Sequence, residues 1–185
     1  MEGSSALAAL ASGAAEQPNG FVRLAFEKMD PMSSVHTFPL HLRFGDEDSY
    51  GHVNNVRYLQ FLEDARVHLM SEAQPQGSFM ELVDPEHYAL VGRQEIEYRA
   101  PLNFSLTPAA VDLWVTAVGG SSFELGYVVR DQLGQDGGTT CAVATTTMVL
   151  VHRVTGRPVR LSETQRQLLA SWTGPAVPFR RARGQ

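Results

Sequence analysis

The residue types best suited to chemistry are concentrated in residues 45–55, Gly-Asp-Glu-Asp-Ser-Tyr-Gly-His-Val-Asn-Asn. This polar segment precedes a stretch with helical periodicity. A helix N-terminus offers free backbone N–H groups and a positive dipole end, which suit an oxyanion or a polarised carbonyl. Asp48 supplies a carboxylate that could act as a base or as a nucleophile. Together these groups could suffice for acyl transfer to water, a reaction that needs no metal.

A calcium loop is the first alternative for this segment, because Asp46, Asp48 and Gly51 have a similar spacing. Such a loop requires an oxygen-bearing side chain such as Asp or Asn at its fifth position and Glu at its twelfth. Tyr50 and Arg57 occupy those positions, which disfavours calcium.

Simple structural roles are a second alternative for the polar residues of the segment. Asp46 and Glu47 are interpreted as solvated loop acids. Asn54 and Asn55 are good helix N-caps and could have no other role.

Other parts of the chain carry weaker signals. The six histidines show no zinc-ligand spacing, so no metal site is predicted. Neither a phosphate loop, a dinucleotide fingerprint nor a Gly-x-Ser-x-Gly elbow is present, so no cofactor is predicted. Cys141 lies in a strand pattern and is interpreted as a buried packing residue. Glu63 could be a second catalytic carboxylate, although a surface pair with Arg66 is the favoured interpretation.

The elements that must position the polar segment can be predicted from periodicity. An alternating run over residues 38–44 predicts a strand before it. Apolar residues spaced by three and four predict a long helix after it, with Asn54 or Asn55 as its N-cap. The apolar face of that helix consists of Tyr58, Phe61, Leu62, Ala65 and Leu69.

Four strands are predicted next, at about residues 90–99, 111–117, 123–129 and 141–151, with Gly-rich turns between the later ones. A short helix follows, opened by the capping-box pattern at Ser162 and Gln165. We therefore expect an α+β fold in which a curved antiparallel sheet wraps around one long helix.

Composition places limits on the rest. The chain has 185 residues, 43% of them apolar, and a net charge of −5, which argues against a nucleic-acid partner. No apolar run is long enough for a membrane span, and the single cysteine favours a cytoplasmic setting. We expect a disordered extension over residues 1–34, one domain over 35–173, and a loose basic tail over 174–185.

Residues 43–66, which include the polar segment and the start of the helix, resemble the opening of hot-dog-fold acyl-CoA thioesterases. The relatives are the 4-hydroxybenzoyl-CoA thioesterase superfamily, particularly its long-chain acyl-CoA thioesterase branch. The likeness continues more loosely through residues 96–102 and 148–158, and covers about residues 35–172. It implies a long helix wrapped by an antiparallel sheet, the arrangement that periodicity predicts independently.

The resemblance also implies roles for individual residues. Asp48 matches the catalytic carboxylate, and the backbone N–H near Asn55 matches the group that polarises the thioester carbonyl. His52 and Asn54 match polar residues that shape the loop. Other branches place a Glu on the helix, which keeps Glu63 as a secondary candidate.

The substrate implied by the resemblance is an acyl-CoA, and the assembly is a homodimer or homotetramer with shared active sites. Coenzyme A would lie against the subunit surface, where Arg side chains meet its phosphates. The substrate-binding candidates are Asn54, Tyr58, Arg93, Arg99 and Arg157.

Two rival functions stay open at this point. A hot-dog enoyl-CoA hydratase would pair an Asp with a His five positions later in a Pro-containing loop, whereas Asp48 and His52 are four apart with no proline between them. A non-catalytic acyl-CoA-binding regulator would usually carry a DNA-binding module, for which the N-terminal extension is too short and too rich in Ala and Gly.

Overall fold

The computed structural model describes residues 35–71, 79–134 and 138–180, all within one compact unit, Met32–Gln185. The predicted disordered extension, residues 1–34, lies outside the described residues.

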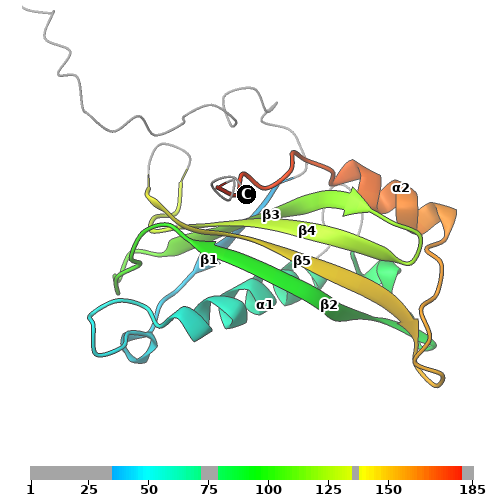
Figure 1. Cartoon of the computed structure of the whole chain (residues 1–185), viewed down its shortest axis with the longest axis horizontal. Helices are drawn as coiled ribbons and strands as arrows, with labels where there is room; N and C mark the ends of the chain where they lie inside the picture. The colour runs from blue at the N-terminus through cyan, green and yellow to red at the C-terminus, as the bar shows by residue number, and fades with distance from the viewer. Residues whose placement is uncertain (1–34, 72–78, 135–137, 181–185) are drawn as a thin grey trace, which may run out of the picture. The chain divides into compact units, whose positions relative to one another are not determined.

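Five strands form a single antiparallel sheet in the order β1-β3-β4-β5-β2 (Figure 1). They are β1 (His36–Leu40), β2 (His87–Tyr98), β3 (Ala109–Val118), β4 (Ser122–Arg130) and β5 (Thr140–His152). Neighbours β3, β4 and β5 are consecutive in the sequence, as expected for strands joined by glycine-bearing turns. The predicted α+β architecture is therefore confirmed.

The long helix α1 (Asn55–Ser71) lies across one face of this sheet (Figure 1). All five residues of the predicted apolar face are buried there, because their spacing of three and four places them on one side of the helix. They pack against alternate residues of the strands, such as Leu113 on β3 and Tyr127 on β4, which form the main core.

The remaining elements are short. The 3₁₀ turns are η1 (Phe44–Asp46) and η2 (Phe79–Leu82), and helix α2 (Glu163–Ser171) follows the sheet. The predicted capping box is confirmed, since the Ser162 hydroxyl accepts the Gln165 N–H at 3.2 Å and the Gln165 side chain accepts the Ser162 N–H at 2.9 Å. The strand predicted over residues 38–44 is shorter than expected, because β1 ends at Leu40 and η1 begins at Phe44.

Residues 173–180, here called the C-terminal strap, cover part of the other face of the sheet. Trp114, Val128 and Val143 form a second buried cluster there, against which Val177 and Phe179 pack. Strand alternation explains this cluster, because neighbours of inward-facing residues point to the opposite face.

Backbone groups also anchor the strap. The Gly174 N–H donates to the Val115 carbonyl at 2.9 Å, and the Trp114 indole donates to the Pro175 carbonyl at 2.7 Å. The expectation of a loose tail is therefore wrong for residues 174–180, and residues 181–185 lie outside the described part.

Candidate active site

The loop between η1 and α1 is closed by hydrogen bonds of its own backbone. The Asp48 N–H donates to the His52 carbonyl at 3.0 Å, and the Gly51 N–H donates to the Asp48 carbonyl at 3.1 Å. Gly51 has a φ of 78°, which a residue with a side chain rarely adopts. The Val53 N–H donates to the Leu102 carbonyl at 2.7 Å and so attaches the loop to the segment after β2.

Asp48 presents a carboxylate that is partly accessible, with 20% of its side chain exposed. One oxygen accepts the Tyr50 N–H at 2.8 Å, which orients the group. The same oxygen lies 3.8 Å from Nδ1 of His52, whose ring stacks on that of Tyr50. The second oxygen has no hydrogen-bond partner within the described ranges and is available to a water molecule.

Of the two predicted caps, Asn54 and Asn55, Asn54 caps helix α1, because its side-chain oxygen accepts the Val56 N–H at 3.0 Å. The Asn54 carbonyl accepts the Arg57 N–H at 2.9 Å, so the N–H groups of Val56 and Arg57 both have partners. The remaining donor at the start of the helix is the N–H of Asn55. That donor has no partner in the part of the chain that the structure describes. It is therefore suited to a ligand carbonyl at the positive end of the helix dipole.

A cavity of about 490 Å³ brings these groups together. It is lined by Asp48, Tyr50, His52, Val53, Asn55, Tyr58, Tyr98, Arg99, Ala100 and Pro101. Five residues singled out from the sequence thus share one cavity: Asp48, His52, Asn55, Tyr58 and Arg99. The lining thus includes the residue that carries the carboxylate, Asp48, and the residue that carries the backbone donor, Asn55.

Tyr98 also lines this cavity and was not identified from the sequence. Its hydroxyl donates to the Asn55 carbonyl at 3.0 Å, and its ring meets that of Tyr58 edge-on. Burial raises the pKa of both tyrosines, so both hydroxyls stay protonated at neutral pH. The sequence signals were its position near the end of a predicted strand, shortly before Ala100 and Pro101, and its place in the loosely matching residues 96–102.

The other predicted residues lie outside the cavity wall. Asn54 serves as the helix cap. Arg93 is 71% exposed in the middle of β2 and pairs with Glu95 at 2.7 Å. Arg157 lies in the turn after β5, at the opposite end of the β2–β5 pair from Arg99, because Tyr98 pairs with Ala142 and His87 with His152.

Glu63 is exposed on α1 and does not line the cavity. The favoured pair of Glu63 with Arg66 is wrong, since Arg66 is buried and donates to the Tyr127 hydroxyl at 3.4 Å. The position of Arg66 on the core side of the helix explains the difference.

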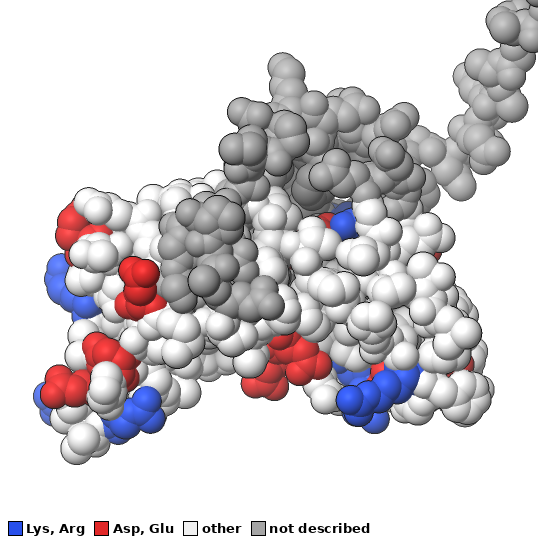
Figure 2. Space-filling view, turned by 180° about the vertical axis from the view of Figure 1, so that it is seen from behind, with Lys and Arg blue, Asp and Glu red and all other residues white. Residues whose placement is uncertain are grey.

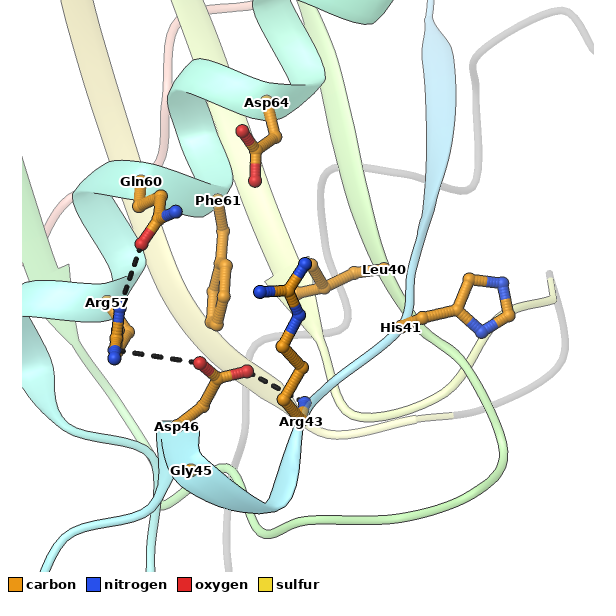
Figure 3. A pocket seen from close by; sticks show the side chains of 9 residues that line it. All are labelled: Leu40, His41, Arg43, Gly45, Asp46, Arg57, Gln60, Phe61 and Asp64. Carbon is orange, nitrogen blue, oxygen red and sulfur yellow. Dashed lines mark hydrogen bonds and ion pairs between the residues drawn. The ribbon is translucent and has the colours of Figure 1, made fainter.

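Asp46 and Glu47 are not solvated loop acids, which corrects a second interpretation. Asp46 is buried and borders a separate cavity of about 270 Å³ between the loop and α1 (Figure 3). Glu47 is half-buried and accepts the Phe104 N–H at 2.8 Å. Both acids therefore hold the loop in place, Glu47 through a residue 57 positions away and Asp46 through residues nearer in the sequence.

No group of three or more His, Cys, Asp or Glu side chains that could hold a metal occurs among residues 35–71, 79–134 and 138–180. Over the same ranges, no helix is long and apolar enough to cross a membrane.

Figure 2 shows acidic and basic side chains in small separate groups on the visible face, without a continuous basic surface.

The family model described as the thioesterase-like superfamily matches residues 42–169. The chain belongs to the thioesterase-like superfamily. The matched region begins before the loop and ends in α2, so it includes every residue of the cavity that holds Asp48 and Asn55. A search of curated proteins found no significant match.

Several solved structures have the same fold, and some of them are described as thioesterases. The PA5185 protein from Pseudomonas aeruginosa strain PAO1 is 27% identical, with a TM-score of 0.60 over 75% of this chain and 91% of that one. The probable thioesterase YbaW from Escherichia coli is 24% identical, with a TM-score of 0.61 over 76% and 99% of the two chains. A thioesterase from Thermus thermophilus, solved with coenzyme A and Zn, is 25% identical, with a TM-score of 0.57 over 72% and 95%. The predicted hot-dog fold is thereby confirmed.

Proposed function

We propose that this member of the superfamily hydrolyses acyl-CoA thioesters, with water as co-substrate and a carboxylic acid and free coenzyme A as products. The observation that carries the proposal is that one cavity is lined both by Asp48 and by Asn55, whose N–H has no partner among the described residues. Thioester hydrolysis needs a group that activates water and a group that polarises the carbonyl, and these two residues supply one each.

In this mechanism, the thioester carbonyl oxygen accepts the Asn55 N–H and gains negative charge at the positive end of α1. One lost donor of this kind typically costs ~10²–10³ in rate. The tetrahedral intermediate then collapses, the carbon–sulfur bond breaks, and the coenzyme A thiolate leaves and takes up a proton.

Asp48 has two routes open to it. As a base, it accepts a proton from the attacking water, whose oxygen forms the new bond to the carbonyl carbon. As a nucleophile, it attacks the carbonyl itself, and water then hydrolyses the resulting anhydride and regenerates the carboxylate. Both routes release the same products and need no metal.

Arg99 is the cavity residue best suited to the phosphates of coenzyme A. It is half-buried, and its Nε donates to Glu97 at 2.9 Å, which fixes the guanidinium beside the cavity. The coenzyme A bound to the Thermus relative supports this choice of ligand. Arg93 and Arg157 stay weaker candidates because neither lines the cavity.

We also propose that the chain assembles as a dimer, or as a tetramer built from two dimers, through the β2 edge. The other edge, β1, has five residues and contains Pro39, whereas β2 has twelve and exposes nearly half of Leu90 and Val91. A long edge strand with exposed apolar residues favours pairing with a second chain.

The setting we propose is cytoplasmic, in keeping with the single cysteine.

The test is hydrolysis of acyl-CoAs of rising chain length, together with one aromatic acyl-CoA, by the full chain and by Asp48→Asn. This substitution keeps the size of the side chain and removes the base, so we expect kcat to fall at least about 10²-fold. Asp64→Asn, on the exposed side of α1, is the control and should behave like the unmodified chain.

Three results would count against the proposal. Asp48→Asn that hydrolyses substrate at the normal rate would remove Asp48 from the mechanism. Tight acyl-CoA binding without turnover by the unmodified chain would favour a binding protein. Hydration of an enoyl-CoA without thioester cleavage would favour a hydratase.

A further inference from the structure

We propose that Asp46 is a positioning residue that sets the geometry between Asp48 and the Asn55 N–H, an inference that rests on the proposed function. Asp46 does not line the Asp48 cavity, so it acts through other residues. It contacts three segments that must be held together: the chain leaving β1, the residue that precedes Asn55, and the first turn of α1.

The carboxylate of Asp46 makes two of these contacts (Figure 3). One oxygen accepts the Arg43 N–H at 2.8 Å, at the point where the chain leaves β1. The other lies 3.6 Å from Nε of Arg57, on the first turn of α1. The Asp46 side chain is 9% exposed, whereas the Arg57 side chain is 44% exposed, so the carboxylate is buried at the inner end of a pair whose other end reaches solvent.

The backbone of Asp46 makes the third contact. Its carbonyl accepts the Asn54 N–H at 2.9 Å, across the loop. Asn54 is the helix cap and directly precedes Asn55, while Asp48 lies two residues beyond Asp46 on the other side of the loop. A shift of Asp46 therefore moves the proposed base and the proposed oxyanion donor relative to each other.

The charge of the side chain is needed as well as its size. A carboxylate can accept from the Arg43 N–H and face the Arg57 guanidinium at the same time. An asparagine has one acceptor oxygen. If that oxygen accepts the Arg43 N–H, the NH₂ group faces the Arg57 guanidinium, and two donors oppose each other. Arg57 is itself held by Gln60, whose Oε1 accepts from Nη1 at 3.0 Å, so it cannot easily move away.

Asp46→Asn is the informative variant, and Asp64→Asn is the matched control. Asp64 borders the 270 Å³ cavity that Asp46 also borders, but it makes no contact to the loop in the described structure. A misplacement of about 1 Å can cost ~10²-fold in rate. We expect kcat of Asp46→Asn to fall by about 10- to 100-fold, with KM within about threefold of normal. Asp64→Asn should change neither parameter.

A double variant separates positioning from general destabilisation. If Asp46 acts partly through Arg57, Asp46→Asn combined with Arg57→Gln should lose little more kcat than Asp46→Asn alone. Additive losses would contradict the role of this pair.

Hydrogen exchange provides a readout that does not depend on activity. We expect the Asn54 amide and its loop neighbours to exchange at least about tenfold faster in Asp46→Asn, with the β3–β5 amides unchanged. Unchanged loop exchange, or normal kcat in a folded Asp46→Asn, would overturn the inference. If instead the unmodified chain hydrolyses no acyl-CoA while the loop amides exchange faster as expected, the proposed function fails and the structural role of Asp46 stands.

Discussion

The Tyr98 hydroxyl donates a hydrogen bond of 3.0 Å to the carbonyl of Asn55, and so joins the end of β2 to the first residue of α1. Asn55 lines the candidate active site, and its own N–H has no partner in the described part of the chain. The relationship connects two residues that are 43 positions apart in the sequence. It makes the orientation of the helix N-terminus depend on the sheet.

Tyr98→Phe removes this hydrogen bond while keeping the ring that packs against Tyr58. A net hydrogen bond contributes about 0.5–1.5 kcal/mol, which corresponds to roughly a 2- to 12-fold change in rate if it is all expressed at the transition state. We expect kcat to fall within this range and the free energy of unfolding to fall by no more than about 1.5 kcal/mol. A loss as large as that of Asp48→Asn would indicate that the hydroxyl contacts the substrate directly.

Cys141 should be unreactive in the folded protein. Burial, aided by the charge of Asp131, raises the pKa of its thiol to about 11. At pH 8 only about one thiol in a thousand would then be ionised, and the thiolate is the reactive form. Labelling with a thiol reagent should therefore be very slow at pH 8 and become stoichiometric in denaturant. Rapid labelling of the native chain at pH 8 would contradict the buried packing role.

Truncation after Thr173 removes the part of the C-terminal strap that covers Trp114 and Val143. Exposing large buried apolar side chains costs roughly 1.5–3 kcal/mol each, so we expect the free energy of unfolding to fall by about 2–5 kcal/mol. Chemical denaturation measures this loss. Arg180→Ala is the control, because it removes only the exposed ion pair with Glu97 and should cost less than about 1 kcal/mol.

The β2 edge predicts the behaviour of the assembly. We expect no stable monomer at micromolar concentration, and Val91→Lys should shift the chain toward monomer in light scattering. Val67→Lys, at an exposed position on α1, should leave the β2-paired dimer intact.

Deletion of residues 1–20, which have no apolar periodicity, should alter neither assembly nor hydrolysis. A monomeric and fully active full-length chain would contradict the shared site.

Hydrolysis should survive exhaustive dialysis against a chelator, since the proposed steps use only Asp48, a backbone donor and water. Activity that is lost on dialysis and restored by a divalent ion would refute this mechanism.

Patterns between near neighbours in the sequence were sufficient to predict much of this protein. The spacing of Tyr58, Phe61, Leu62, Ala65 and Leu69 identified the buried face of α1, and the pair Ser162 and Gln165 identified the start of α2. Such features follow from the 3.6-residue period and from capping groups within one turn. The resemblance over residues 43–66 led to the family, while periodicity independently predicted the architecture.

Only the tertiary structure decided which groups meet across the chain. It placed Tyr98 against Asn55, the Glu47 carboxylate against the Phe104 N–H, and Arg66 against Tyr127 instead of Glu63. Each contact joins residues more than 40 positions apart, and its formation depends on how the sheet curves around α1. Asp46 looked like a solvated acid because nothing beside it in the sequence shows that β1, the loop and α1 converge there. A residue's type and its neighbours determine its local conformation, whereas its burial and its partners depend on the packing of distant segments.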